Sequence, residues 1–305
     1  MRVLLTGGSG MLGRALSRVA GDVELLMPAR GALDLADRAA VAAYCGDMGV
    51  AAVVHGAARV GGIQANIDDP VGFLADNLAM NDGTIMGAHA AGVTRFVFLG
   101  SSCMYPRDHR QPLVEEDVLA APLEPTNEGY ALSKITGAKL CEYISRQYPD
   151  RFYRTLIPCN LYGVDDHFGS VASHLIAAIV TKVVAARDAG ADSVEIWGTG
   201  RARREFLYVD DLARFILSAL PRLEAFPDLL NVGYGTDHSV DAYYRMVADV
   251  AGYRGGFHHD TSKPEGMQQK LMSSARAAAL GWAPAIPMAE GLARVVAAWE
   301  ARRPR

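Results

Sequence analysis

Near its start the chain reads Val3-Leu4-Leu5-Thr6-Gly7-Gly8-Ser9-Gly10-Met11-Leu12-Gly13, an apolar run that breaks into glycines. A helix-like segment, residues 14–20, follows directly. Three glycines spaced by three residues let the backbone turn tightly and let a pyrophosphate reach a helix N-terminus. A glycine-rich turn alone could be structural, but the strand before it and the helix after it favour a dinucleotide site. The residues that we predict to contact the cofactor here are Gly7, Ser9, Gly10, Met11 and Gly13.

A second apolar run, residues 23–26, ends in Met27-Pro28-Ala29-Arg30. Enzymes that use NAD usually place a carboxylate here for the ribose 2′-hydroxyl. This chain offers Arg30 instead, and a guanidinium suits a 2′-phosphate. Arg30 could also be an ordinary surface arginine. On balance the sequence predicts NADP(H) as the cofactor, with Arg30 as its 2′-phosphate contact.

Strand-like runs continue to alternate with helical segments, with apolar runs at residues 50–55, 96–99 and 153–157. After the first of these, small residues including Ala57 would let a cofactor lie against the backbone. We expect a loop over residues 60–66 and two separate helices near Asn77 and Ala88. The alternation predicts an α/β fold, a Rossmann-like doubly wound parallel sheet with a smaller C-terminal substrate lobe.

The lobes can be assigned by residue range. We expect residues 1–163 to form the NADP-binding Rossmann domain, completed by a return segment near residues 206–235. Residues 164–205 and 236–305 would form the substrate-binding lobe.

Composition narrows the class of protein. The chain has 305 residues, half of them apolar, and a net charge of −4, so nucleic acid is not an expected partner. The N-terminus reads as a strand rather than a signal peptide, and we expect no membrane association. Four scattered cysteines, Cys45, Cys103, Cys141 and Cys159, lack metal-ligand spacing. These features predict a reduced, cytoplasmic protein without a metal site.

A candidate reaction centre lies between residues 96 and 134. Tyr130 and Lys134 are four residues apart in a helix-like segment, so they share one face. On many proteins such a pair is only a solvated helix surface. Here Ser101 leaves the end of a strand, where open α/β sheets place their sites. We expect Lys134 to lower the pKa of Tyr130, and Tyr130 and Ser101 to contact the same carbonyl oxygen.

A group of arginines, Arg201, Arg203 and Arg204, stands out in an otherwise acidic chain. It suggests an anionic ligand such as a diphosphate. The alternative is a solvated loop.

Several motifs together carry a family resemblance: Val60-Gly61-Gly62-Ile63, Leu99-Gly100-Ser101-Ser102-Cys103-Met104-Tyr105-Pro106, Leu123-Glu124-Pro125-Thr126-Asn127-Glu128-Gly129-Tyr130, Asn160-Leu161-Tyr162-Gly163, Ser173-His174, Arg204-Glu205-Phe206-Leu207 and Lys263-Pro264. With them the chain resembles the extended short-chain dehydrogenase/reductase family over nearly its whole length. Within that family it is similar to NADPH-dependent enzymes that epimerise C3 and C5 of GDP-4-keto-6-deoxy-D-mannose and then reduce C4.

The resemblance implies roles for individual residues. The family's catalytic serine, tyrosine and lysine fall on Ser101, Tyr130 and Lys134, and Lys134 would also contact the cofactor ribose. Its epimerisation pair falls on Cys103 and His174, a thiol and an imidazole that can exchange the roles of acid and base. Alone, each of the two could equally be a packing residue. The residues expected to bind the GDP-sugar are Asn160, Lys182, Trp197, Arg204 and Lys263. Many relatives pair through two long helices, so we expect a homodimer.

Two stretches depart from the family pattern. Residues 167–174 read His-Phe-Gly-Ser-Val-Ala-Ser-His, where the family has Asn-Phe-His-Pro-x-Asn-Ser-His, and residues 263–273 differ as well. Both border the substrate in the family. Three alternatives therefore stay open: a 4-reductase without epimerisation, an enzyme for another GDP-sugar such as a colitose-related deoxy sugar or a heptose, and a catalytically silent NADP-binding sensor or scaffold.

Overall fold

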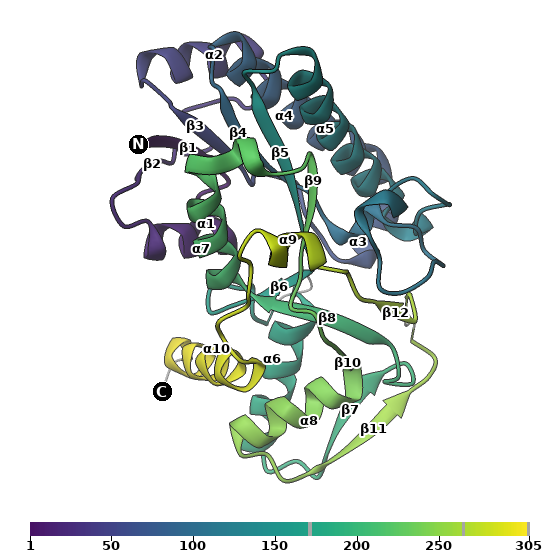
Figure 1. The fold of residues 1–305 in the computed structure, drawn as a ribbon. Coiled ribbons are helices and arrows are strands. Elements are labelled where there is room, and N and C mark those ends of the chain that lie inside the picture. The colour runs from purple at the N-terminus through teal and green to yellow at the C-terminus, as the bar shows by residue number, and fades with distance from the viewer. Residues whose placement is uncertain (170–172, 264–265, 304–305) are drawn as a thin grey trace.

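A six-stranded parallel sheet forms the centre of the larger part of the molecule, with strand order β2-β1-β3-β4-β5-β9. The computed structural model describes residues 1–169, 173–263 and 266–303. Figure 1 shows this sheet in its upper half. The strands are β1 (Arg2–Thr6), β2 (Glu24–Leu26), β3 (Ala52–His55), β4 (Arg95–Leu99), β5 (Phe152–Pro158) and β9 (Leu229–Val232). The predicted Rossmann-like parallel sheet is confirmed.

Two layers of helices cover the sheet (Figure 1). In one layer α4 packs between α2 and α5, and in the other α1 packs against α7. The central strands between them are mostly buried, and side chains such as Phe96 and Phe98 are wholly inaccessible. These helices are α1 (Met11–Val19), α2 (Arg38–Asp47), α4 (Pro70–Ala90), α5 (Glu128–Gln147) and α7 (Val209–Ala219).

Two local expectations were wrong. A short helix, α3 (Ile63–Asp68), stands where we expected only a loop, because the glycines end at Gly62 and the helix starts after them. The two helices expected near Asn77 and Ala88 are one, α4. Its interior glycines let α2 approach, since a Cβ on Gly83 would lie 2.2 Å from the carbonyl oxygen of Leu35.

The smaller lobe occupies the lower half of Figure 1 and has its own apolar core. A four-stranded sheet in which β8 pairs with β6, β10 and β12 links it to the larger part, and β7 pairs with β11. Side chains from α6, α8 and α10, such as Ile179, Val247 and Leu292, fill its core. Its strands are β6 (Asn160–Tyr162), β7 (Ser193–Trp197), β8 (Arg203–Tyr208), β10 (Asp237–Ser239), β11 (Gly256–Asp260) and β12 (Gln269–Lys270). Its helices are α6 (Leu175–Asp188), α8 (Val240–Ala251) and α10 (Met288–Arg302), with α9 (Ala275–Ala279) lying against β9.

The chain crosses between these parts more than once. After β6 and β8, helix α7 and strand β9 return to the large sheet, and the chain then leaves it again for β10 and α8. The residue boundaries of the two lobes stay a prediction. Among the described residues, no helix is both long enough and apolar enough to cross a membrane.

Candidate active site

The glycine turn between β1 and α1 forms a cradle of bare backbone. Gly7 has a φ of +75°, and a Cβ on it would lie 2.8 Å from the backbone nitrogen of Ala57. A Cβ on Gly13 would lie 2.4 Å from the carbonyl oxygen of Gly8, so the turn closes only with glycine there. Within the described residues no side chain caps the first turn of α1, which starts after Gly10. Its N–H groups suit an anion such as a pyrophosphate.

Arg30 lies beyond the end of β2 and is exposed. The first acidic residue after it, Asp34, turns its carboxylate to the backbone N–H of Ala36 at 2.9 Å. Asp34 therefore stabilises its own turn rather than standing at the strand end. The segment after β2 therefore carries an exposed cation at its start, and the contact of Arg30 with a 2′-phosphate stays a prediction.

A chain of buried hydrogen bonds runs from Ala57, next to the glycine turn, to Ser133 on α5. The Oγ1 of Thr6 accepts from the N–H of Ala57 at 3.2 Å and lies 2.7 Å from Nδ1 of His55. The other ring nitrogen of His55 lies 3.0 Å from Oδ1 of Asn81, whose amide donates to the carbonyl oxygen of Ser133. Burial lowers the pKa of His55 to about 3, so this imidazole stays neutral and acts as a packed strand-end residue.

Four of the five residues expected to be catalytic, Ser101, Cys103, Tyr130 and Lys134, come together where β4 ends and α5 begins. Oγ of Ser101 accepts from the backbone N–H of Cys103 at 3.2 Å and is hydrogen-bonded to the phenol of Tyr130. The ammonium of Lys134 is buried and donates to the carbonyl oxygen of Leu99 at 2.8 Å. The serine, thiol, phenol and ammonium thus lie near one another at the carboxyl end of β4.

The expected pKa relation between Tyr130 and Lys134 was wrong. Burial raises the pKa of Tyr130 well above its ordinary value, the nearby Cys103 raises it further, and only the hydrogen bond with Ser101 lowers it. Nζ of Lys134 is directed to Leu99 and lies 5.8 Å from the centroid of the Tyr130 ring. Burial lowers the pKa of Lys134 itself to about 8. Tyr130 therefore keeps its proton at neutral pH, which is the state that a proton donor needs.

The thiol of Cys103 has a partner that the sequence analysis missed. Nδ2 of Asn127 donates to its sulfur at 3.2 Å, from the short 3₁₀ turn Pro125–Asn127 that precedes α5. Asn127 stood within a quoted motif, but no spacing rule marks an asparagine as the neighbour of a cysteine 24 residues earlier. It holds the sulfur beside the rest of the cluster.

His174 stands directly before α6 and pairs with Asp166, a second residue that the sequence analysis missed. Nδ1 of His174 lies 2.8 Å from Oδ1 of Asp166. The hydrogen bond to this carboxylate raises the pKa of His174, against the opposing effect of burial. Half of the His174 side chain, 51%, remains exposed, whereas that of Asp166 is 1% exposed. Residues 170–172 of the altered stretch lie outside the described residues.

A cavity of about 310 Å³ in the smaller lobe collects most of the predicted substrate residues. Lys182, Trp197 and Arg204 line it, with Leu175, the residue after His174, at its edge. Nζ of Lys182 lies 5.0 Å from the Trp197 ring, and Nζ of Lys263 lies 5.6 Å from it. An exposed indole between two cations, with an arginine in the same cavity, suits a nucleotide base and its phosphates.

Asn160 is placed differently from those four residues. Its amide donates to the backbone oxygen of Glu205 at 2.9 Å and so joins β6 to β8. Glu205 is wholly buried and accepts backbone N–H groups from Gly235 and Met272. Through these hydrogen bonds Glu205 helps to organise the junction of the lobes. Burial raises the pKa of Glu205 to about 7. Pro264 of the predicted lysine motif lies outside the described residues.

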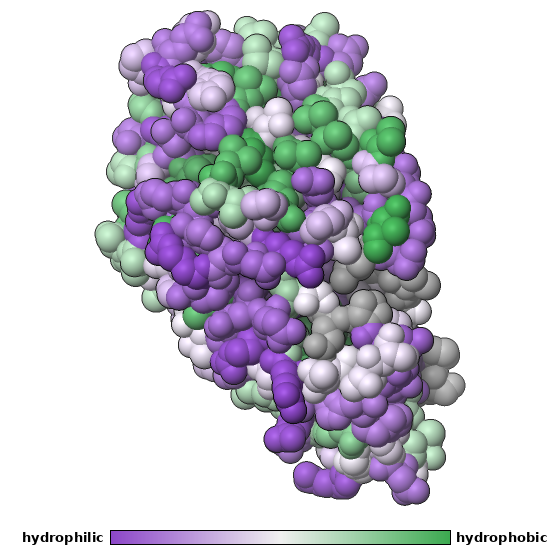
Figure 2. Space-filling model, turned by 90° about the vertical axis from the view of Figure 1, so that its right-hand side faces the viewer, coloured by the Kyte–Doolittle hydropathy of each residue, from purple (hydrophilic) through white to green (hydrophobic). Residues whose placement is uncertain are grey.

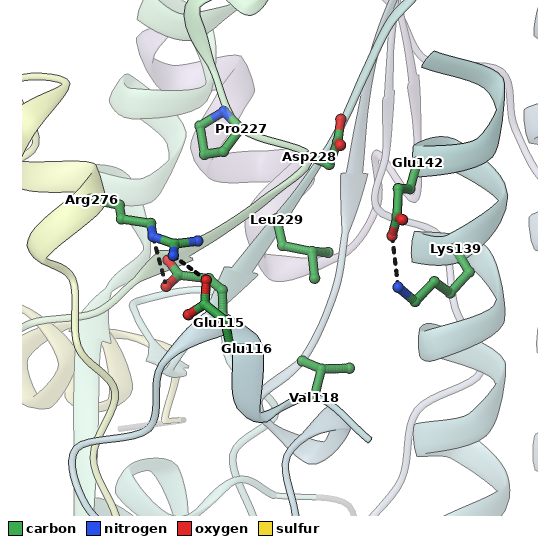
Figure 3. A pocket seen from close by; sticks show the side chains of 9 residues that line it. All are labelled: Glu115, Glu116, Val118, Lys139, Glu142, Pro227, Asp228, Leu229 and Arg276. Carbon is green, nitrogen blue, oxygen red and sulfur yellow. Dashed lines mark hydrogen bonds and ion pairs between the residues drawn. The ribbon is translucent and has the colours of Figure 1, made fainter. Parts of the chain in front are cut away.

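A second cavity, of about 360 Å³, lies away from these groups, between α5 and β9 (Figure 3). Most of its charged side chains pair within it: Arg276 pairs with Glu115 and Glu116, and Lys139 pairs with Glu142, whereas Asp228 pairs with Arg154 outside the lining. It contains none of the proton-transfer residues, so we place the active site at the β4–α5 cluster instead. Among the described residues, no group of three His, Cys, Asp or Glu side chains could hold a metal.

Comparison with known proteins shows the family of the chain. The NAD dependent epimerase/dehydratase family matches residues 3–233. The chain belongs to this family. It is 42% identical to GDP-L-colitose synthase of Yersinia pseudotuberculosis over 296 residues, 96% of each chain. It is 47% identical to GDP-L-fucose synthase of Azorhizobium caulinodans over 285 residues, 93% of this chain and 91% of the relative.

Solved structures of family members share the whole fold. A GDP-6-OMe-4-keto-L-xylo-heptose reductase from C. jejuni superposes with a TM-score of 0.90 at 27% identity, covering 99% of this chain and 98% of that one. A GDP-mannoheptose C4 reductase from Campylobacter jejuni with NADP bound gives 0.88 at 28% identity, covering 98% of each chain. The resemblance inferred from the motifs is confirmed.

Proposed function

We propose that this family member is an NADPH-dependent epimerase/reductase of a GDP-4-keto-6-deoxy sugar, acting at C3 and C5 and then at C4. The observation that carries the proposal is the set of proton-carrying groups around the end of β4. Ser101 hydrogen-bonds there to the backbone N–H of Cys103 and to the phenol of Tyr130, and His174 lies one residue from the nucleotide-sized cavity. The relatives named GDP-L-fucose synthase and GDP-L-colitose synthase support a GDP-sugar as substrate.

The cradle at the start of α1 fits NADP(H). Bare backbone at Gly7 and Gly13 leaves room for the pyrophosphate, and the exposed Arg30 after β2 is a cation that suits a 2′-phosphate. When bound there, NADPH supplies the hydride for C4. A relative solved with NADP bound supports this choice of cofactor.

The chain's own residues supply the proton transfers. A ketone at C4 acidifies the C–H bonds at C3 and C5, so Cys103 and His174 can remove and return protons there as a base and acid pair. In the reduction Tyr130 donates its phenol proton to the C4 oxygen, and Ser101 holds that oxygen by a hydrogen bond. The ammonium of Lys134 is held by the carbonyl oxygen of Leu99 and would contact the cofactor ribose.

A second candidate is an enzyme of the same kind for a different GDP-sugar. The 42% identity with GDP-L-colitose synthase and the structural match to heptose reductases support it, because the names of these proteins give other GDP-sugars. The altered residues 167–172 border His174, so a reductase that no longer epimerises belongs to the same candidate.

Product analysis separates these candidates. The protein is incubated with GDP-4-keto-6-deoxymannose and NADPH in deuterated water, and the sugar is examined by NMR and mass spectrometry. The proposal expects NADPH oxidation, deuterium at C3 and C5, and a product inverted at both centres. NADPH oxidation without deuterium at either carbon would identify a plain 4-reductase, and no turnover with this sugar would point to another substrate.

The assembly that we propose is a homodimer formed through α4 and α5. Figure 2 views the side on which these helices lie and shows apolar residues gathered over its upper part. Exposed apolar side chains on α3, α4 and α5 are Ile67, Val71, Leu132 and Tyr143. Light scattering should give twice the chain mass, and a Val71→Glu, Leu132→Glu double variant should give a single chain mass. A natural protein that stays monomeric at high concentration would exclude the dimer.

We also propose a cytoplasmic location. All four cysteines are free thiols, and three of them, Cys45, Cys141 and Cys159, are buried, which suits a reducing compartment. Fractionation of the source cells tests this directly, and recovery of the protein outside the cytoplasmic fraction would exclude it.

A further inference from the structure

The pairing of His174 with Asp166 is built into the fold more firmly than a surface ion pair. The Asp166 side chain is 1% exposed, and its Oδ1 also accepts the backbone N–H of His167 at 2.8 Å. Its Oδ2 is buried without a hydrogen-bond partner among the described residues. A buried carboxylate is costly unless its hydrogen bonds compensate for the lost water. The side chain that offsets this cost at Asp166 is the imidazole of His174.

The loop that carries the pair is fixed on both sides. Asp165, the preceding residue, turns to the arginines Arg14, Arg18 and Arg302, from α1 and α10. Phe168 stacks on Trp299 of α10 with ring centroids 5.1 Å apart. The two adjacent aspartates therefore have different tasks: Asp165 ties the loop to the neighbouring helices, and Asp166 faces the histidine.

This geometry decides which nitrogen of His174 is free. An ionised carboxylate can only accept hydrogen bonds, so Nδ1 of His174 must carry the hydrogen that Oδ1 of Asp166 accepts. In the neutral ring the lone pair is then on Nε2, and in the charged ring Nε2 carries the second proton. Half of the His174 side chain is exposed, and the next residue, Leu175, lines the nucleotide-sized cavity.

We propose that Asp166 is a positioning residue that fixes the tautomer of His174, so that Nε2 is the atom that exchanges a proton with the sugar carbon. This inference rests on the proposed function. In one epimerisation, the thiolate of Cys103 takes the proton from the carbon next to the ketone, and the C–H electrons form an enolate. Nε2–H of the imidazolium then gives its proton to the opposite face of that carbon, and the ketone re-forms. Cys103 is left as a thiol and His174 as a neutral imidazole that still donates Nδ1–H to Asp166, and both exchange protons with water before the next event.

Asp166→Asn tests the pairing without changing the size of the side chain. An amide can present either its oxygen or its NH₂ to Nδ1, so the tautomer is no longer fixed. The control is Asp165→Asn, which removes the neighbouring carboxylate and its arginine contacts but leaves the pair intact. The first readout is long-range ¹H–¹⁵N NMR of ¹⁵N-histidine protein, with the His174 signals assigned by their loss in His174→Gln.

The natural protein should show His174 with Nδ1 protonated, and Asp165→Asn should keep this pattern whatever it loses in stability. Asp166→Asn should show a mixed or Nε2-protonated ring. The second readout is deuterium entry at C3 and C5 of GDP-4-keto-6-deoxymannose in deuterated water. Removing the carboxylate that orients a metal-bound histidine costs about 10- to 100-fold, and we expect a loss of the same order here, with NADPH binding unchanged.

Failure of the inference and failure of the proposed function give different experimental results. If the natural protein and Asp166→Asn show the same His174 tautomer and the same deuterium entry, the role of Asp166 is overturned and the epimerase function is left intact. A natural protein that oxidises NADPH without any deuterium entry would remove the epimerase function, and with it the catalytic role of Nε2. A comparable loss of exchange in Asp165→Asn with an unchanged tautomer would assign the effect to loop anchoring and would also overturn the inference.

Discussion

Replacing Tyr130 with Phe removes one hydroxyl group from the centre of the site and keeps the ring. That hydroxyl is hydrogen-bonded to Ser101, and burial keeps its pKa above the ordinary value, so it holds its proton at neutral pH. Loss of a positioned general acid costs roughly 10²- to 10⁴-fold in rate, which corresponds to about 2.7–5.5 kcal/mol of barrier. The cost to folding is far smaller, about 0.5–1.5 kcal/mol for one neutral hydrogen bond.

The assay is NADPH oxidation at pH 7 under single-turnover conditions, with NADPH affinity measured separately by fluorescence. We expect the hydride step to slow by at least about a hundredfold while NADPH affinity stays within a factor of about two, because the glycine cradle is untouched. Tyr143→Phe is the matched control, since Tyr143 lies on the same helix but is 47% exposed. A Tyr130→Phe enzyme with near-normal turnover, or one whose loss is explained by weaker NADPH binding, would refute the assignment of Tyr130 as proton donor.

Three further predictions concern the cofactor, the thiol and pH. Arg30→Ala should raise the KM for NADPH but hardly that for NADH, by an amount equivalent to roughly 1.5–3 kcal/mol for a lost charged contact; equal effects on both cofactors would exclude the 2′-phosphate role. Cys103→Ser should lose deuterium entry at C3 and C5, because a hydroxyl cannot act as the base, while slow NADPH oxidation continues; undiminished exchange would exclude the thiol as the proton carrier. Asp166 raises the pKa of His174, so their pairing stabilises the fold fully below the unfolded pKa of about 6.5 and is lost as pH rises through the folded value. Asp166→Asn should therefore lower the melting temperature more at pH 6 than at pH 8.5, and an equal shift at both would contradict this.

Local patterns in the sequence were enough to predict those site residues that lie on one helix or at the end of one strand. The glycine turn follows β1 and opens α1 within a few residues, so its spacing and its neighbours could be read together. Tyr130 and Lys134 share α5, and Ser101 follows β4, so strand-end and helix-face rules brought them together. The structure places these groups in one cluster.

What the sequence could not supply was contact between side chains from different elements. Asp166 stands in a polar loop with no periodicity, and nothing marks it out from Asp165 until the fold turns one to His174 and the other to arginines. The prediction that Lys134 lowers the pKa of Tyr130 was wrong for a related reason. The four-residue spacing correctly placed Lys134 on the same helix, but it could not show that the ammonium points to Leu99, nor that burial raises the pKa of the phenol.

The altered stretch before His174 bears on which reaction this family member performs. Enzymes named as synthases and as reductases share this fold over nearly their whole length, so the fold alone does not separate them. The departures from the family pattern lie at positions 167, 169, 170 and 172, next to Phe168, which stacks on Trp299, and before His174, which pairs with Asp166. Phe168 and His174 themselves match the family pattern, and the imidazole keeps its carboxylate partner. A retained pair of His174 with Asp166 favours an enzyme that still epimerises over a plain reductase, and deuterium entry at C3 and C5 tests this.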